Sequence, residues 1–256
     1  MAGEVPVLEL KGISKRFGGI VALNDVDMEL REGEILGIVG DNGAGKSTLI
    51  KIISGVYEKD SGEIYFKGKK VEINNPKDAM ELGIGTVYQD LALVDTLDLP
   101  ENMFLGREVK HEGLRGSIFR FLNFRKMRRE SERVLRRLNV NVPDVRIPVM
   151  YLSGGQRQII PLAKIVYWTK EMIILDEPTA ALGVKESKKV LDLIKRLKEQ
   201  GLSTIIISHN LQHIFEVVDR IMILRGGKKV DVVRAHEATA DEIVSMITGA
   251  ASVKKV

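Results

Sequence analysis

Residues 35–48 read Ile35-Leu36-Gly37-Ile38-Val39-Gly40-Asp41-Asn42-Gly43-Ala44-Gly45-Lys46-Ser47-Thr48, and this stretch decides the fold. Its first five residues are apolar or glycine, which predicts a strand buried on both faces, as in a parallel sheet covered by helices. The following nine residues match the phosphate-binding loop pattern G-x4-G-K-[ST]. A helix is expected to start near Lys46 and to end at Gly55. A strand, a glycine-rich loop and a helix in this order are the context in which the pattern holds a phosphate.

The residue types in this loop suit phosphate binding. Glycines allow backbone N–H groups to turn inward around phosphate oxygens, at the positive end of the following helix. Lys46 would place its charge on the β- and γ-phosphates, and the Ser47 hydroxyl can ligate Mg²⁺. A glycine-rich turn without a ligand is the alternative. The expected nucleotide-binding residues here are Gly40, Asp41, Asn42, Gly43, Ala44, Gly45, Lys46, Ser47 and Thr48.

The rest of the chain alternates between apolar runs and helical patterns, which predicts an α/β fold with a mainly parallel sheet. Short apolar runs recur at residues 172–175, 204–207 and 221–224, and helices are expected over residues 184–200 and 240–248. The N-terminal part reads as short strands of an antiparallel layer. Residues 100–138 read as helical, with an apolar stripe under abundant arginine; the stripe is formed by Met127, Val134, Leu135 and Leu138.

Two carboxylates, Asp176 and Glu177, follow directly on the apolar run at residues 172–175. A buried parallel strand delivers its C-terminal residues to the sheet edge at which α/β folds bind ligands. Asp176 could hold Mg²⁺ through water, and Glu177 could accept a proton from an attacking water, a contribution of about 10²–10⁴-fold in rate. Alone, such a run is as often a strand that meets solvent. The phosphate loop in the same chain favours the metal and base interpretation.

Composition excludes several classes of protein. The 256 residues include no cysteine, so there is no disulfide framework, thiolate nucleophile or thiolate metal site. The N-terminus lacks the pattern of a secretory signal, and no apolar run approaches the roughly 18 residues of a spanning helix. We therefore expect a protein that is neither exported by that route nor itself membrane-spanning.

Positive charge is concentrated in one segment. The whole chain has a net charge of +4, whereas residues 107–137 hold eleven Lys/Arg and four Asp/Glu, a balance of +7. A solvated basic helical face is the simplest interpretation, and nucleic acid or an anionic membrane surface are the alternatives.

The most specific motif is Leu152-Ser153-Gly154-Gly155-Gln156. Ser153 and Gln156 have the spacing of a capping box at a helix start, and a glycine-rich helix N-terminus is also an anion site. Capping alone is the alternative interpretation. Together with the phosphate loop and the Asp-Glu strand, this motif resembles the signature of the ATP-binding subunit of ABC transporters, and the resemblance covers nearly the whole chain.

The resemblance implies a single ABC ATPase domain over residues 1–256, that is, a P-loop NTPase core (residues 1–99 and 150–256) with an inserted helical subdomain at about residues 100–149. It implies that Ser153, Gly154, Gly155 and Gln156 contact the γ-phosphate bound by a second copy, in a head-to-tail dimer with ATP and Mg²⁺ between the copies. It also assigns Gln89 to the loop that senses Mg²⁺ and the attacking water, His209 to γ-phosphate contact, and Phe17 to stacking on adenine; a buried core Phe is the alternative for Phe17. The other histidines, His111, His213 and His236, read as surface residues.

Two residues differ from those that the family pattern or a regular helix leads us to expect. Gly183 stands where the family usually has an Asp that couples the two sites across the dimer. Pro161 falls inside the helix that Ser153 begins, where it removes one intrahelical bond and should kink the helix.

Details such as Gly40-Asp41-Asn42 and residues 84–89 look most like the branch that imports simple sugars. This resemblance implies a peripheral protein on the cytoplasmic face of the membrane, with transmembrane permease subunits as partners and an extracytoplasmic solute-binding protein as an indirect one. Nucleic acid is not expected as a partner. A non-transport ABC ATPase acting on DNA or ribosomes is the competing hypothesis, because of the basic segment. A P-loop kinase is a third, but it leaves residues 152–156 unexplained.

Overall fold

The strand before the phosphate loop lies inside a six-stranded sheet in the computed structural model, which describes residues 5–90, 92–111, 121–140, 142, 144–180 and 182–250. Strand β3 (Ile35–Val39) is buried at every residue and pairs in parallel with two neighbours. The strand order is β10 (Lys228–Arg234), β9 (Arg220–Arg225), β3, β8 (Ser203–Ile207), β7 (Met172–Asp176) and β6 (Ile84–Val87). Only the β9–β10 pair is antiparallel, so the predicted, mainly parallel sheet is confirmed.

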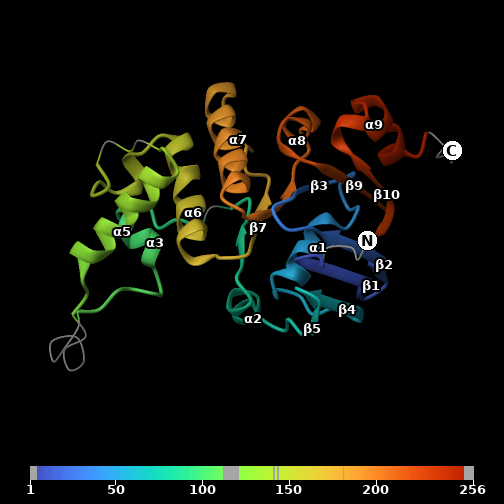
Figure 1. The fold of residues 1–256 in the computed structure, drawn as a ribbon, viewed down its shortest axis with the longest axis horizontal. Coiled ribbons are helices and arrows are strands. Elements are labelled where there is room, and N and C mark those ends of the chain that lie inside the picture. The colour runs from blue at the N-terminus through green and yellow to red at the C-terminus, as the bar shows by residue number, and fades with distance from the viewer. Residues whose placement is uncertain are drawn as a thin grey trace. The chain divides into compact units, whose positions relative to one another are not determined.

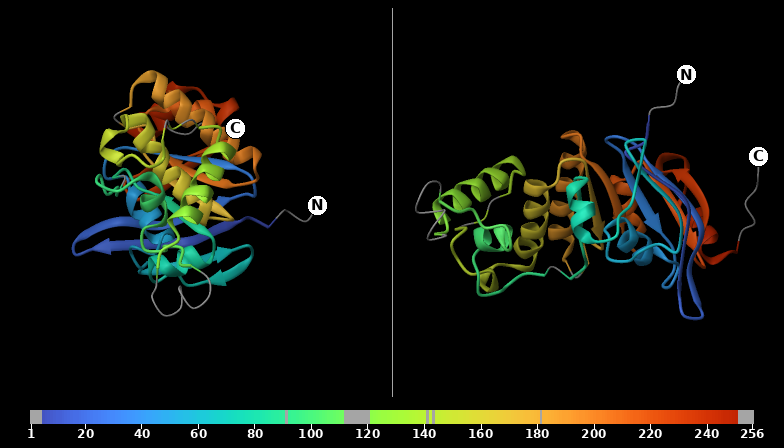
Figure 2. Two further views of the ribbon diagram at one scale, coloured as in Figure 1. Left: turned by 90° about the vertical axis from the view of Figure 1, so that its left-hand side faces the viewer. Right: turned by 90° about the horizontal axis from the view of Figure 1, so that it is seen from below.

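The expected antiparallel layer is also present, as a four-stranded sheet. Its order is β2 (Ile20–Leu30), β1 (Leu8–Phe17), β4 (Ser61–Phe66) and β5 (Lys69–Val71). The long hairpin of β1 and β2 is drawn in blue in Figure 2. Buried and exposed residues mostly alternate along β2, the pattern of a sheet with one face on the core.

The core of this part of the chain lies between the two sheets. Alternate residues of the parallel strands, such as Leu36, Ile38, Ile174 and Ile205, pack with the antiparallel strands and with α1 (Lys46–Ile53) in one buried cluster. The opposite face of the parallel sheet is covered by α8 (Leu211–Val217) and α9 (Ala240–Thr248), as Figure 1 shows. This two-sided burial explains why the parallel strands are apolar throughout.

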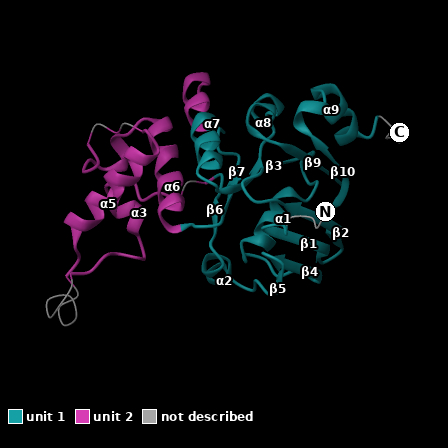
Figure 3. Ribbon diagram, in the orientation of Figure 1, with its two compact units in different colours: residues 1–89, 169–180, 191–256 teal, residues 90–168, 181–190 magenta. Residues whose placement is uncertain are grey.

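The chain divides into two compact units (Figure 3). Unit 1 comprises residues 1–89, 169–180 and 191–256 and holds both sheets, with α2 (Pro76–Glu81) between β5 and β6. Unit 2 comprises residues 90–168 and 181–190 and holds α3 (Leu99–Phe104), α5 (Phe124–Arg137) and α6 (Gly154–Trp168). Helix α7 (Val184–Glu199) begins in unit 2 and continues into unit 1. Among the residues described, no helix has the length and apolarity needed to cross a membrane.

The prediction of helix throughout residues 100–138 is wrong in part. Helix α3 ends at Phe104, and Gly106 adopts the left-handed conformation with φ of 78°, which is incompatible with continuing the helix. Lys110 and Leu122 then form an antiparallel bridge, and helix resumes only at α5. The predicted apolar stripe of α5 is buried, as expected. Residues 112–120 of this segment lie outside the described residues.

Helix α6 runs through Pro161 as one element. Its C-terminal end is held by an aromatic cluster in which Phe104, Tyr167 and Trp168 pack edge to face, with ring centroids 4.8–5.6 Å apart. The Trp168 indole N–H donates to the Met103 carbonyl at 3.1 Å. This packing anchors the C-terminal half of the helix within unit 2.

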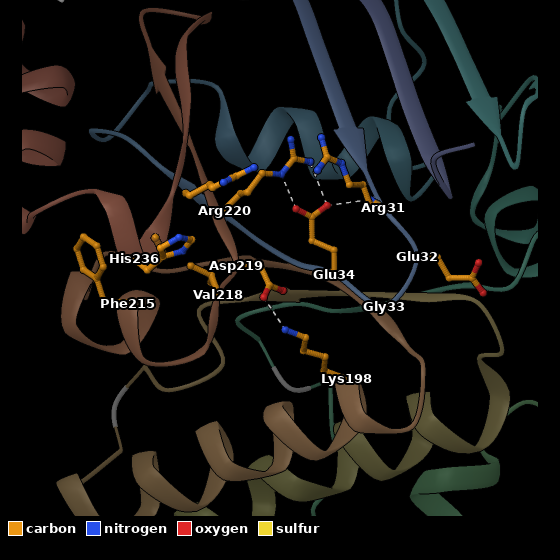
Figure 4. Close-up of a pocket in the computed structure, with 12 residues that line it drawn as sticks. Arg31, Glu32, Gly33, Glu34, Lys198, Phe215, Val218, Asp219, Arg220 and His236 are labelled. Atoms are coloured by element: carbon orange, nitrogen blue, oxygen red, sulfur yellow. Dashed lines mark hydrogen bonds and ion pairs between the residues drawn. The ribbon is translucent and has the colours of Figure 1, made fainter. Parts of the chain in front are cut away.

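A charged network closes unit 1 at the N-terminal end of β3, opposite the phosphate loop (Figure 4). The Glu34 carboxylate is only 7% exposed and accepts two hydrogen bonds from the Arg220 guanidinium, at 2.5 and 3.0 Å. It also accepts one from the Arg31 backbone N–H at 2.8 Å. Beside it, Asp219 accepts from the Ile35 N–H at 2.9 Å and from Lys198 at 2.5 Å. The charged groups of this network line part of a cavity of about 510 Å³ and pair with one another, which indicates a structural role for the network.

Replacing Arg220 with Met is expected to lower the free energy of unfolding by about 3 kcal/mol, because it leaves the buried Glu34 carboxylate unpaired. The matched control is Arg234→Met, whose pair with Glu237 is exposed and should contribute less than about 1 kcal/mol. Urea denaturation of both variants measures the difference. The double variant Glu34→Leu, Arg220→Met should regain much of the loss. Equal, small losses for both single variants would contradict the assigned role of the network.

Candidate nucleotide site

The loop between β3 and α1 is held by close backbone contacts. A Cβ atom at Gly40 would lie 2.2 Å from the Leu224 carbonyl oxygen, and one at Gly45 would lie 2.6 Å from that of Ala22. Both glycines have positive φ, 156° and 104°. The Gly227 N–H also donates to the Ala44 carbonyl at 3.1 Å. Gly40 and Gly45 are thus required by space as well as by conformation.

Lys46 is held at the centre of this loop. Its side chain is buried, and the ammonium donates to the carbonyl oxygens of Gly40 and Asp41 at 2.7 and 2.9 Å. Burial lowers the pKa of Lys46, against the opposing effect of the carboxylates of Glu177, Asp41 and Asp176. The loop carbonyls therefore hold the Lys46 ammonium, and its positive charge lies near the N-terminus of α1.

The N-terminus of α1 is open to a ligand. Its N-cap, Gly45, supplies no side-chain hydrogen bond to the first turn of the helix, so N–H groups there are left for an anion. Ser47 is exposed and Thr48 is half-buried beside it. Both line a cleft of about 300 Å³ within unit 1, together with the loop from Asn42 to Lys46.

Asp176, Glu177 and His209 enter the same cleft from the ends of β7 and β8. The His209 backbone N–H donates to Glu177 Oε1 at 2.9 Å, and the His209 ring Nε2 lies 3.3 Å from the same oxygen. The Ser208 hydroxyl donates to Glu177 Oε2 at 3.4 Å. Glu177 adopts a left-handed backbone conformation, with φ of 51°, which is strained for a residue with a side chain. Its carboxylate is thereby fixed by the neighbouring strand end.

The two carboxylates resist ionisation. Burial raises the pKa of Asp176, against the attraction of Lys51, Lys46 and His209. Burial likewise raises the pKa of Glu177, and the charge of Asp176 adds to this; His209 and the hydrogen bonds from His209 and Ser208 oppose it. A carboxylate whose pKa is raised is a stronger base once ionised, which suits proton abstraction.

Gln89 lines the cleft, whereas Phe17 is not among the residues that line it. Gln89 is exposed and lines the cleft just after β6. The preceding Tyr88 hydroxyl is within 2.7 Å of the Ser54 hydroxyl at the end of α1, which ties this segment to the phosphate-loop helix. Phe17, at the end of β1, is 42% exposed and packs edge to face on Tyr57, with ring centroids 5.1 Å apart. The apolar residues that line the cleft from this hairpin are Ile20, Val21 and Ala22.

The donor set of the cleft fits Mg²⁺. Among the described residues there is no group of three or more His, Cys, Asp or Glu side chains that could hold a metal by themselves. Mg²⁺ characteristically binds one or two carboxylates together with substrate phosphates and water. Asp176, the Ser47 hydroxyl and the Gln89 amide supply oxygen ligands of this kind on one cleft.

The signature residues form the start of α6, in unit 2. The Ser153 N–H donates to Gln156 Oε1 at 3.0 Å, and the Gln156 N–H donates to Ser153 Oγ at 3.3 Å, so the predicted capping box is present. Gly154 has open space around it, whereas a Cβ at Gly155 would lie 2.8 Å from the Glu186 Cγ. The backbone of this turn is therefore uncovered at Gly154, and the Glu186 side chain packs against it at Gly155.

One contact near the carboxylates could not be predicted from the sequence. His213, expected at the surface, is half-buried, and its Nδ1 lies 3.0 Å from the hydroxyl of the buried Thr179. Thr179 follows Glu177 by two residues, so this hydrogen bond holds the segment after the candidate base. His111 and His236 are exposed, as expected.

Known proteins match the chain over most of its length. A sequence model of the family described as ABC transporter matches residues 23–180. The chain is 47% identical over 242 residues to the xylose/arabinose import ATP-binding protein XylG of Sulfolobus acidocaldarius, covering 94% of each. It is 44% identical over 246 residues to the fructose import ATP-binding protein FrcA of Rhizobium meliloti, covering 96% of this chain and 95% of that one. It is also 42% identical to the ribose import ATP-binding protein RbsA of Caldanaerobacter subterraneus, of which it spans 48%.

Solved structures agree. A nucleotide-free ATP-binding cassette from an ABC transporter superposes with a TM-score of 0.79 at 25% identity, covering 95% of each chain. A dimeric ATP-binding cassette bound to ADP and Pi gives a TM-score of 0.73 at 26% identity, covering 89% of this chain and 98% of that one. The chain belongs to the ABC transporter family of ATP-binding proteins, and the fold and family expected from the sequence are confirmed.

We expect the pKa of Glu177 to shift in opposite directions in two variants. His209→Ala removes a charge that lowers this pKa, so the pKa should rise; Asp176→Asn removes a charge that raises it, so the pKa should fall. Titration of the labelled Glu177 carboxyl carbon by NMR, without nucleotide, measures both. Because the raised pKa delays ionisation, the base is lost as the pH falls, and at a higher pH in His209→Ala than in the wild type. Shifts of the same sign in both variants would contradict this electrostatic account.

Proposed function

We propose that the chain is the ATP-hydrolysing subunit of an importer for simple sugars. The observation that carries the proposal is the convergence of Lys46, Asp176, Glu177 and His209 on one cleft beside an open helix N-terminus. As a member of the ABC transporter family the chain binds and hydrolyses ATP.

Each group in the cleft has a role in this reaction. The N–H groups of residues 40–48 hold the β- and γ-phosphates, and Lys46 leaves its loop carbonyls to neutralise them. Glu177, fixed by the N–H of His209, accepts the proton of the attacking water. His209, whose ring is 57% exposed on the cleft, contacts the γ-phosphate.

Mg²⁺ would be held by Ser47 and Asp176, with Gln89 close to the attacking water, and when bound it neutralises phosphate charge. The adenine ring would stack on Phe17. Val21 lines the cleft from the adjacent strand and adds apolar surface for it. Nucleotide affinity measured for Phe17→Ser and for Val21→Ser separates the contribution of ring stacking from that of the apolar surface of the cleft.

Two copies would form the working unit. Residues 153–156 of one copy would contact the γ-phosphate bound by the other, and closure over ATP would drive separate permease subunits. Residues 1–256 would form one ABC ATPase domain, with about 100–149 as its helical subdomain. The chain would act at the cytoplasmic face of the membrane, with an extracytoplasmic solute-binding protein delivering the sugar. The sugar class is supported by similarity to xylose/arabinose, fructose and ribose import proteins.

Glu177→Gln is expected to bind ATP with near wild-type affinity and to hydrolyse it at least about 100-fold more slowly, because the amide cannot accept the proton. ATP should then trap a dimer that size-exclusion chromatography detects. Glu237→Gln, on the exposed surface, is the matched control and should retain wild-type turnover. Wild-type turnover in Glu177→Gln would remove Glu177 from its role.

Lys46→Ala is expected to lose nucleotide affinity or turnover, and with it sugar uptake. Uptake of labelled xylose, fructose and ribose should be measured in cells that carry the chain with its permease, against the same cells with Lys46→Ala. Loss of uptake for a simple sugar supports the proposal. Unchanged ATP affinity and rate would contradict the assignment of the site, and uptake of no simple sugar by the wild type would contradict the substrate class.

A further inference from the structure

The outward side of α5 carries a row of arginines that the proposed ATPase does not use. Arg125, Arg129, Arg133 and Arg136 are spaced by three or four residues, so they share one side of the helix. All four are exposed; the side chains of Arg129, Arg133 and Arg136 are 70%, 79% and 69% accessible. The opposite side is buried in unit 2 and is formed by Met127, Ser131, Val134 and Leu135.

Acidic neighbours neutralise this arginine row only weakly. Its ion pairs are long: Arg129 and Arg133 lie 3.7 and 3.8 Å from Glu130 carboxylate oxygens. Arg136 lies 3.9 Å from the carboxylate of Glu132. Arg125 forms no ion pair with any residue that the structure describes. Two partly buried carboxylates in long ion pairs therefore stand against four exposed guanidinium groups, and the row keeps a positive field.

Helix stability does not account for the arginines in the first half of α5. Acidic residues stabilise the first turn of a helix and basic residues its last turn. The first turn of α5 contains no acidic residue and includes Arg125. Arg125 thus opposes the helix dipole, whereas Arg136 in the last turn complements it. The row accordingly indicates an anionic partner outside the chain.

We propose that the arginine row of α5 binds the anionic headgroups of a phospholipid surface. The inference rests on the proposed function, because a subunit attached to a permease is held beside the membrane. The row spans about 17 Å along a straight helix, which presents its charges to a plane. Phe121 and Phe124, 58% and 49% exposed, lie at the N-terminal end of the helix and supply apolar rings of the kind found at membrane interfaces. Clusters of four or more basic residues on a helix are typical of binding to anionic lipid.

The test is sedimentation of the full chain with vesicles of phosphatidylglycerol and phosphatidylcholine in equal parts, and with vesicles of phosphatidylcholine alone. The wild type should bind only the anionic vesicles, and binding should fall with salt. The variant Arg125→Gln, Arg129→Gln, Arg133→Gln, Arg136→Gln should bind at least about tenfold more weakly, since each basic residue near such a surface contributes roughly fivefold.

The matched control removes the same charge from other exposed positions: Lys69→Gln, Lys188→Gln, Lys189→Gln, Lys228→Gln. It should bind anionic vesicles like the wild type. Equal loss in both variants would show an effect of net charge alone and overturn the proposal, as would binding of short duplex RNA in preference to the vesicles. ATP hydrolysis by the purified chain should be unchanged in both variants. Weaker lipid binding with normal hydrolysis in the arginine variant would support the role of the arginine row. Absent hydrolysis in the wild type would instead contradict the proposed function.

Discussion

The structure depends on the contact between the phosphate loop and the backbone of its neighbours. Gly40 meets the Leu224 carbonyl of β9, and Gly45 meets the Ala22 carbonyl of β2, so the loop is wedged between the two sheets of unit 1. Any side chain at either position would push one of these strands away. The backbone of the loop is therefore fixed between these strands while its carbonyls hold Lys46, and the start of α1 stays available to an anion. The buried strand β3, whose residues Leu36 and Ile38 pack in the core cluster, holds the start of this loop in place.

Burial disfavours the charged forms of the ionisable groups in the candidate site. Burial lowers the pKa of Lys46 and raises those of Asp176 and Glu177, so each group is held where its charged form is disfavoured. The strained backbone of Glu177 adds to this. In the folded protein the pKa of Asp176 and of Glu177 is higher than in the unfolded chain. Ionisation of these groups therefore lowers the free energy of unfolding as the pH rises through the folded pKa. By contrast, the Glu34–Arg220 pair at the other end of β3 is fully matched and stabilises the same sheet. The stabilising ion pair and the candidate site thus lie at opposite ends of β3.

Local patterns in the sequence predicted what depends on local physics. Continuous apolar runs identified β3, β7, β8 and β9, and the Ser-x-x-Gln spacing identified the start of α6. Contacts between distant residues could not be predicted in this way. Arg220 reaches Glu34 across 186 positions, and His213 pairs with Thr179 across 34 positions, with no periodicity to indicate either. The break after Phe104 was missed because basic and apolar residues continue through the segment, whereas the backbone leaves the helical conformation at Leu105, with ψ of 122°, and Gly106 has a positive φ. The contact of the Phe17 ring with Tyr57 was likewise not predictable from the sequence, and stacking of Phe17 on adenine stays a prediction.

Gly183 and Glu186 lie close together within unit 2. The Glu186 carboxylate lies where a Cβ at Gly183 would come within 2.8 Å of it, and its Cγ approaches Gly155 equally closely. An Asp at position 183, the usual residue in the family, would bring a second carboxylate beside the first, and two like charges at that distance repel. A side chain at position 183 would make the Glu186 carboxylate turn aside, which a flexible glutamate side chain does at little cost. The acidic group beside position 183 in unit 2 is therefore Glu186, which lies three residues further along in the first turn of α7.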